Sequence, residues 1–110
     1  MVKIGNVEIS GPMTLAPMAG VTDFAFRAIC TELGAALTTT EMVSAKALCY
    51  GDNKTKSLLY NLPACRPFAA QIFGHEPEIM AQAAPIAIEY SGADMLDICL
   101  SYTSPSPRDA

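Results

Sequence analysis

The feature that most constrains this chain is the alternation of short apolar runs with segments of helical periodicity. Apolar runs extend from Met13 to Met18, Ala35 to Met42, Phe68 to Phe73 and Ala93 to Ile98. Runs of this length, bounded by glycine or proline, are typical of strands buried on both faces of a parallel sheet. Helix-like segments separate them, so the predicted order is β(αβ)₃, an α/β fold with parallel strands.

Local signals predict where the first helix begins and ends. Thr22 offers an N-cap oxygen, and Asp23 would lie in the first turn, where the helix dipole favours an acid. Gly34 is a natural stop. The apolar residues of this segment predict one buried face, made of Phe24, Ile29 and Leu33.

The sequence signals for the two later helical segments differ in clarity. The stretch from Tyr50 to Lys54 is polar and predicts a loop or a broken helix. A longer helix should open near Pro77 and run to about Ser91, before Gly92, with one side buried. Pro85 within it should kink or shorten the helix.

Residues 2–9 alternate around Gly5-Asn6 and predict a short hairpin ahead of the first parallel strand. Two architectures fit the pattern that follows: an open doubly wound sheet and a closed (β/α)₈ barrel. A closed barrel takes about 250 residues. The 110 residues here could supply roughly half of one.

Composition suits an interior piece of a larger fold. Apolar residues make up 51% of the chain and charged residues 16%, against roughly 25% charged in an average soluble domain. The net charge is −4 and the 7 Lys and Arg are scattered. Phosphate-backbone binding needs a basic face, so this segment alone is a poor nucleic-acid binder.

The 4 cysteines show no CxxC spacing, so no zinc or redox motif is expected, and no other metal site is predicted. The start of the chain lacks the pattern of a signal peptide. No apolar run approaches the ~20 residues that cross a bilayer. We expect a cytoplasmic protein with reduced thiols and no membrane partner.

In parallel α/β folds, ligands gather beyond the carboxyl ends of the strands. Ala19 and Gly20 follow the first strand, and their small size would let a flat ring approach the main chain, although a simple strand stop explains them too. Gln71 carries an amide that can donate and accept, which suits the pyrimidine edge of a flavin. An ordinary hydrogen-bonded loop amide is the alternative.

Two further polar residues near these strand ends have more than one reading. Glu41 could bind a polar substrate edge or cap the helix that follows. His75, the only histidine, is better explained as a surface residue at a helix start than as a catalytic base.

Four segments together resemble one enzyme family. They are APMAGVTDFAFR at 16–27, TTTEMVSAKAL at 38–48, QIFGHEPEIMAQAA at 71–84 and GADMLDI at 92–98. In order and spacing they are similar to the N-terminal part of the tRNA-dihydrouridine synthases, over about four-fifths of the chain. The resemblance favours the barrel, of which this chain would be the N-terminal half.

The resemblance implies an FMN enzyme that reduces uridine in tRNA to 5,6-dihydrouridine, with NAD(P)H as the reductant of the flavin. The target base would be drawn out of the tRNA into the pocket. Pro17, Met18 and Ala19 match the segment that lies against the flavin ring. Gln71 matches the glutamine that holds its pyrimidine edge, and the basic tRNA surface would lie outside these residues.

The chain departs from the family after Ile98. The family continues as Asn-x-Gly-Cys-Pro, whose cysteine donates a proton to the base, and here Tyr102 occupies the position of that cysteine. Cys99 lies three residues too early, so the role is not transferred to it and the chain itself is expected to be inactive. Residues 1–98 are predicted to be a partial FMN-binding barrel domain, and 99–110 a disordered or out-of-frame tail.

Two other functions fit the residues less well. One is a different FMN-dependent barrel oxidoreductase, resembling dihydroorotate dehydrogenase. The other is a non-catalytic βα module that binds a partner. An open half barrel exposes strand edges and apolar surface, so the isolated chain is predicted to be poorly soluble or molten.

Overall fold

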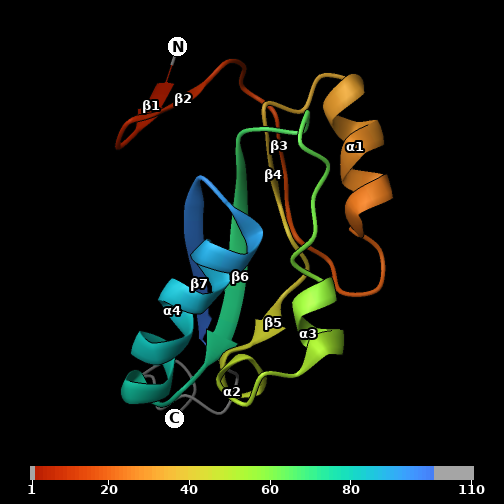
Figure 1. The fold of residues 1–110 in the computed structure, drawn as a ribbon. Coiled ribbons are helices and arrows are strands. Elements are labelled where there is room, and N and C mark those ends of the chain that lie inside the picture. Colours follow the sequence, from red (N-terminus) through yellow and green to blue (C-terminus); the bar gives the residue numbers. More distant parts are fainter. Residues whose placement is uncertain (1, 101–110) are drawn as a thin grey trace, which may run out of the picture.

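The computed structural model describes residues 2–100, without the side chain of Leu100, and opens on the predicted hairpin (Figure 1). Strands β1 (Val2–Ile4) and β2 (Val7–Ile9) pair antiparallel. Gly5 turns the chain between them with φ +60°. The hairpin lies at the end of the sheet where the long strand β6 begins, away from the strand ends that matter for ligands (Figure 1).

The remaining strands form one five-stranded sheet in which every pairing is parallel. Strand β4 pairs with the start of β6 and β5 with its end, while β7 pairs along 69–74 on the other edge of β6. The strands are β3 (Thr14–Leu15), β4 (Leu37–Thr39), β5 (Val43–Ser44), β6 (Phe68–Gly74) and β7 (Met95–Leu100).

The spatial order of the strands decides between the two predicted architectures. With β4 and β5 counted as one strand, because both pair with the same edge of β6, the strands lie in chain order across the sheet: β3, β4 with β5, β6 and β7. A doubly wound sheet would reverse direction at a switch point, whereas a barrel adds strands steadily in one direction. The fold is the N-terminal part of a (β/α)₈ barrel, as predicted, preceded by the hairpin.

Strands β4 and β5 are two pieces of one interrupted strand, of which β4 lies within the predicted run from Ala35 to Met42 and β5 lies just beyond its predicted end. β4 ends with Thr39 opposite Ala69, and β5 resumes with Val43 opposite Ile72. Three residues of this strand therefore lie opposite two of β6, which makes a one-residue β-bulge. Such bulges redirect side chains near functional sites, and Glu41 lies in the middle of this one.

Two of the helical predictions are confirmed. The segment after β5 is a broken helix, with α2 (Ala45–Cys49) and α3 (Asn53–Ser57) separated at Gly51, whose φ is +75°. Helix α4 spans Pro77–Ser91 and ends at Gly92 in the left-handed conformation. Of the two effects expected from Pro85, a kink or a shortening, the shortening does not occur, because the helix continues for six residues beyond this exposed position.

Helix α1 (Phe24–Glu32) differs from its prediction in two ways. Its N-cap is Asp23, which accepts a hydrogen bond from the amide of Phe26 at 2.8 Å. Thr22 is not the cap, because its hydroxyl is engaged with the preceding turn. The three apolar residues expected to form its buried face are exposed instead: Phe24, Ile29 and Leu33.

The core lies between β6 and the helices α2 and α4. Side chains alternate along a strand, so Phe68, Ala70 and Ile72 share one face. That face packs against α2 and α4 (Figure 1), and Gln71 lies on the opposite face. The buried cluster comprises Val43, Ala45, Leu48, Leu59, Phe68, Ala70, Ile72, Ala83, Ala87 and Ala93.

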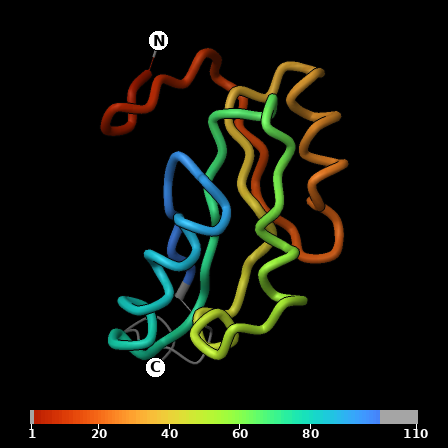
Figure 2. The backbone as a smooth tube through the Cα atoms, viewed as in Figure 1, coloured from red at the N-terminus to blue at the C-terminus, as the bar shows by residue number. Residues whose placement is uncertain are grey.

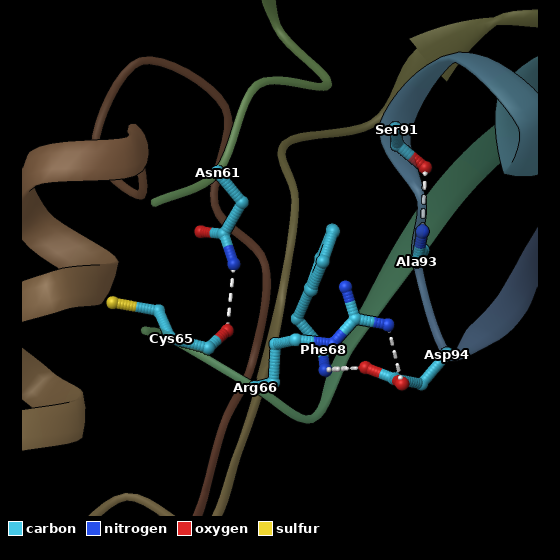
Figure 3. Close-up of polar contacts among 7 residues, drawn as sticks. All are labelled: Asn61, Cys65, Arg66, Phe68, Ser91, Ala93 and Asp94. Atoms are coloured by element: carbon cyan, nitrogen blue, oxygen red, sulfur yellow. Dashed lines mark hydrogen bonds and ion pairs between the residues drawn. The ribbon is translucent and has the colours of Figure 1, made fainter. Parts of the chain in front are cut away.

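A polar tie fixes the starts of β6 and β7 (Figure 3). Asp94 accepts a hydrogen bond from the Phe68 amide at 3.0 Å and forms an ion pair with Arg66 at 2.7 Å. Beside it, the Ser91 hydroxyl accepts from the Ala93 amide at 3.0 Å. The two strands consequently enter the sheet in a defined register, which carries through to their other ends.

Strand β7 continues through Cys99 to Leu100. The tail was predicted over 99–110, and its first two residues belong to β7 instead. The rest of it, 101–110 with Tyr102, lies outside the described residues. Within residues 2–100, no helix is long and apolar enough to cross a membrane. The same residues contain no cluster of His, Cys, Asp and Glu that could hold a metal ion.

Candidate cofactor site

The segment after β3 closes into a tight turn. The amides of Val21 and Thr22 both donate to the Met18 carbonyl at 3.0 Å. Gly20 has φ +78° at the third position of this turn, as a type II turn requires. The Thr22 hydroxyl accepts from the Met18 amide at 3.0 Å and donates back to its carbonyl at 3.2 Å.

Glu41 holds this turn from the neighbouring strand. Its Oε1 accepts a hydrogen bond from the Gly20 amide at 2.6 Å. The side chain is buried, and the bulge between β4 and β5 brings it to the turn. Glu41 therefore contacts the end of the first barrel strand, and it does not cap α2, whose N-cap is Ser44.

Arg27, on helix α1, contacts the same turn. Its guanidinium is fully buried and donates to the Thr22 carbonyl at 2.6 Å. It also donates to the carbonyl of Tyr60 and, at 3.4 Å, to the side chain of Asn61. These contacts join α1 to the segment after α3, which runs beside it in Figure 2. Burial lowers the pKa of Arg27, and the negative charge of Glu41 opposes that shift.

Gln71 points away from the helices, on the face that becomes the barrel interior. Its side chain is 8% exposed. Its Nε2 donates to Asp97 Oδ2 at 2.8 Å, and its main-chain amide donates to the Thr40 hydroxyl at 3.0 Å. Strand β6 continues to Gly74, so Gln71 lies three residues before the strand end and not at its tip.

Hydrogen bonds link these residues into one arc across all the parallel strands. The arc begins at Gly20, bonded to Glu41, whose carbonyl accepts from the Thr40 hydroxyl at 3.1 Å. Thr40 also accepts from the Gln71 amide, and Gln71 donates to Asp97. The residues predicted at three separate strand ends are thus brought together in the folded chain.

The arc leaves groups that can hold a flat heterocycle. Met18 is 60% exposed and offers an apolar surface beside the turn. Apart from Gly20 itself and its two neighbours in the chain, no residue has an atom within 4 Å of the place where a Cβ of Gly20 would stand. Of the described residues, none accepts a hydrogen bond from the Ala19 amide, so this donor remains available. With the Gln71 amide nearby in the arc, these residues fit a flavin ring.

Two residues of the arc, and Arg27 beside it, were not predicted from the sequence. Arg27, Thr40 and Asp97 act through contacts 26 to 34 residues away in the chain, at Asp97–Gln71, Thr40–Gln71 and Arg27–Asn61. Local patterns carry no signal for such contacts. His75 is exposed, with Nε2 at 3.8 Å from Glu76, in keeping with its prediction as a surface residue.

Comparison with known proteins shows which family this chain is similar to. The family "Dihydrouridine synthase (Dus)" matches residues 14–100. tRNA-dihydrouridine synthase B of Pasteurella multocida is 43% identical over 96 residues, which cover 87% of this chain and 29% of that protein. The proteins of the same name from Vibrio parahaemolyticus and Escherichia coli are 38% identical, with 30% of their length covered.

The chain therefore spans about 30% of the length of the relatives that it matches. The matched region contains the whole parallel sheet and every residue of the arc. Sequence similarity over this region and the barrel order of its strands agree. The chain belongs to the dihydrouridine synthase family.

Proposed function

We propose that this segment, completed by the length that its relatives carry beyond it, forms an FMN-dependent tRNA-dihydrouridine synthase. The enzyme would reduce uridine in tRNA to 5,6-dihydrouridine and act in the cytoplasm, where tRNA is found. The observation that carries the proposal is the hydrogen-bonded arc from Gly20 to Asp97. It gathers the turn, Glu41 and Gln71 on one side of the sheet.

Residues of the turn would lie against the flavin ring. Pro17 and Met18 supply apolar surface, and Ala19 supplies a free main-chain donor and a small side chain. Gln71 would bond the pyrimidine edge, which presents two carbonyls and an N–H. A bound flavin, reduced by NAD(P)H, would supply the hydride that adds to the uracil ring, while the protein positions both rings.

Glu41 has two functions in this proposal. One carboxylate oxygen holds the Gly20 amide and so keeps the turn in the shape that receives the ring. The second oxygen is the group that Glu41 can offer to a polar edge of the uracil substrate. Neither function requires Glu41 to transfer a proton.

The proton that completes the reduction must come from another residue. The family's donor cysteine is replaced by Tyr102 in this chain. We therefore propose that the 110-residue chain does not complete the reaction. Family membership separates it from the dihydroorotate dehydrogenase-like alternative, and a non-catalytic role for the isolated chain remains an outcome of the test.

The test uses a completed protein, made by joining residues 1–98 to the part of the Pasteurella multocida protein that follows its matched region. It is incubated with FMN, NADPH and tRNA that lacks dihydrouridine, and nucleosides are analysed by mass spectrometry. We expect dihydrouridine from the completed protein and none from the 110-residue chain. A completed protein that is folded, binds FMN and leaves uridine unreduced would contradict the proposal.

A further inference from the structure

Gln71 and Asp97 form an isolated polar pair on the inner face of the sheet. They are register partners on the adjacent parallel strands β6 and β7. The amide nitrogen Nε2 of Gln71 lies 2.8 Å from Oδ2 of Asp97. Gln71 is 8% exposed, and among residues 2–100 its side-chain amide has no other hydrogen-bond partner.

The chemistry of this pair fixes which way the amide faces. An ionised carboxylate can only accept hydrogen bonds, so it selects the NH₂ end of the amide. The two ends of a glutamine amide have nearly the same shape, and without a partner that distinguishes them the group can turn over. Asp97 therefore directs Oε1 and one N–H of Gln71 toward the space beside it.

We propose that Asp97 is a positioning residue that sets the orientation of the Gln71 amide for the flavin. This inference rests on the proposed function. In this orientation Gln71 presents one acceptor and one donor, which match an N–H and a neighbouring carbonyl of the pyrimidine edge. The flipped amide would place its donors where the ring also has a donor.

The surroundings hold the pair in place. The main-chain amide of Gln71 is fixed by the Thr40 hydroxyl, so the start of its side chain does not move. Asp94, at the beginning of β7, ties that strand to the Phe68 amide (Figure 3). Both strands are thus fixed at their starts, and Asp97 stays level with Gln71 along the sheet.

A purely structural pair makes a different prediction. Cross-strand polar pairs stabilise a sheet by roughly 0.2–1 kcal/mol. If Asp97 did no more than this, its replacement would lower the stability slightly and leave the affinity for FMN unchanged. A positioning residue changes the affinity, and it does so only while Gln71 is present.

The experiment is an FMN titration, followed by flavin fluorescence, of the completed protein and its variants. Asp97→Leu removes the acceptor and keeps the branching of the side chain, and we expect the Kd for FMN to rise about tenfold, as for a lost hydrogen bond to a charged group. Asp97→Asn can pair with either end of the Gln71 amide and so no longer selects one orientation, and it should also weaken FMN binding, though less than Asp97→Leu. Glu89→Gln, at an exposed position on α4 away from the pair, controls for the loss of a carboxylate.

The double variant Q71L/D97L separates positioning from direct binding. If Asp97 acts through Gln71, this variant should bind FMN no more weakly than Q71L alone. Additive losses, or a wild-type Kd in a folded D97L variant, would overturn the inference while leaving the proposed function intact. A parent protein that binds no FMN would overturn both. Should D97L fail to fold, as judged by circular dichroism, the Asp97→Ser variant takes its place.

Discussion

Arg27 connects two parts of the chain that the sequence leaves far apart. Its guanidinium reaches the Thr22 carbonyl at the turn and the Tyr60 carbonyl after α3. A planar group with several fixed donors suits this position better than the single ammonium of lysine. The position of the turn thus depends on this fully buried side chain as well as on Glu41.

Replacing Arg27 by Ala in the completed protein should lower its free energy of unfolding by about 2–4 kcal/mol, because buried carbonyls lose their donor. Arg27→Lys should recover part of the loss. Urea-induced unfolding measures both. Arg66→Ala is the matched control, since its ion pair with Asp94 is half exposed and should contribute below about 1 kcal/mol. Equal losses at the two arginines would be the contrary result.

Some residues of the candidate site could be singled out from the sequence and others could not, for a physical reason. Gln71, Ala19 and Gly20 could be singled out because a polar amide or a small-residue turn beside an apolar strand is a local pattern. Pro17 and Met18 were proposed only from the family resemblance. Arg27 and Asp97 become informative only when the strands are in register. No single-sequence pattern contains that information.

Helices and strands also divide into features that a local pattern marks and features that depend on contacts distant in the chain. Both ends of helix α4 were predicted closely, because Pro77 and Gly92 mark them locally. The N-cap of α1 was misplaced by one residue, because the Thr22 hydroxyl bonds to Met18 and leaves the cap to Asp23. The bulge beside Glu41 was missed, since it exists only relative to β6.

The turn at Gly20 provides a prediction at the level of an element. A side chain at φ +78° is strained even though the space there is open, so Gly20→Ala should cost about 1 kcal/mol of stability in the completed protein and weaken FMN binding. Gly11→Ala is the control, since its Cβ would meet Ala36 at an ordinary 3.6 Å and its backbone is unstrained. Unfolding curves and FMN titration should separate the two variants.

At the scale of the whole molecule, the side formed by β3 and α1 exposes an open strand edge and apolar residues. Strand β3 lies at the edge of the described sheet, and beside it a shallow cavity of about 250 Å³ is lined mainly by Met13, Leu15, Cys30 and Leu33. The outer residues of α1 are exposed and apolar. Open edges and apolar surface of this kind promote association.

The 110-residue chain should therefore self-associate and bind a hydrophobic dye such as ANS. Leu33→Lys, at a position 83% exposed on this side, should reduce both signals. Tyr50→Lys, at a position 79% exposed between α2 and α3, should leave them unchanged. Size-exclusion chromatography and dye fluorescence make the comparison. A monodisperse monomer with a sharp thermal transition would contradict this prediction, because it would show that the exposed side at β3 and α1 does not drive association.

Amide hydrogen exchange of the completed protein, with and without FMN, tests most directly whether the strand ends receive a flavin. We predict that FMN slows exchange in the peptides that contain Ala19 and Gln71, and leaves the hairpin at residues 2–9 unaffected. Saturating FMN that protects neither segment, or protects only regions outside the arc, would contradict the account.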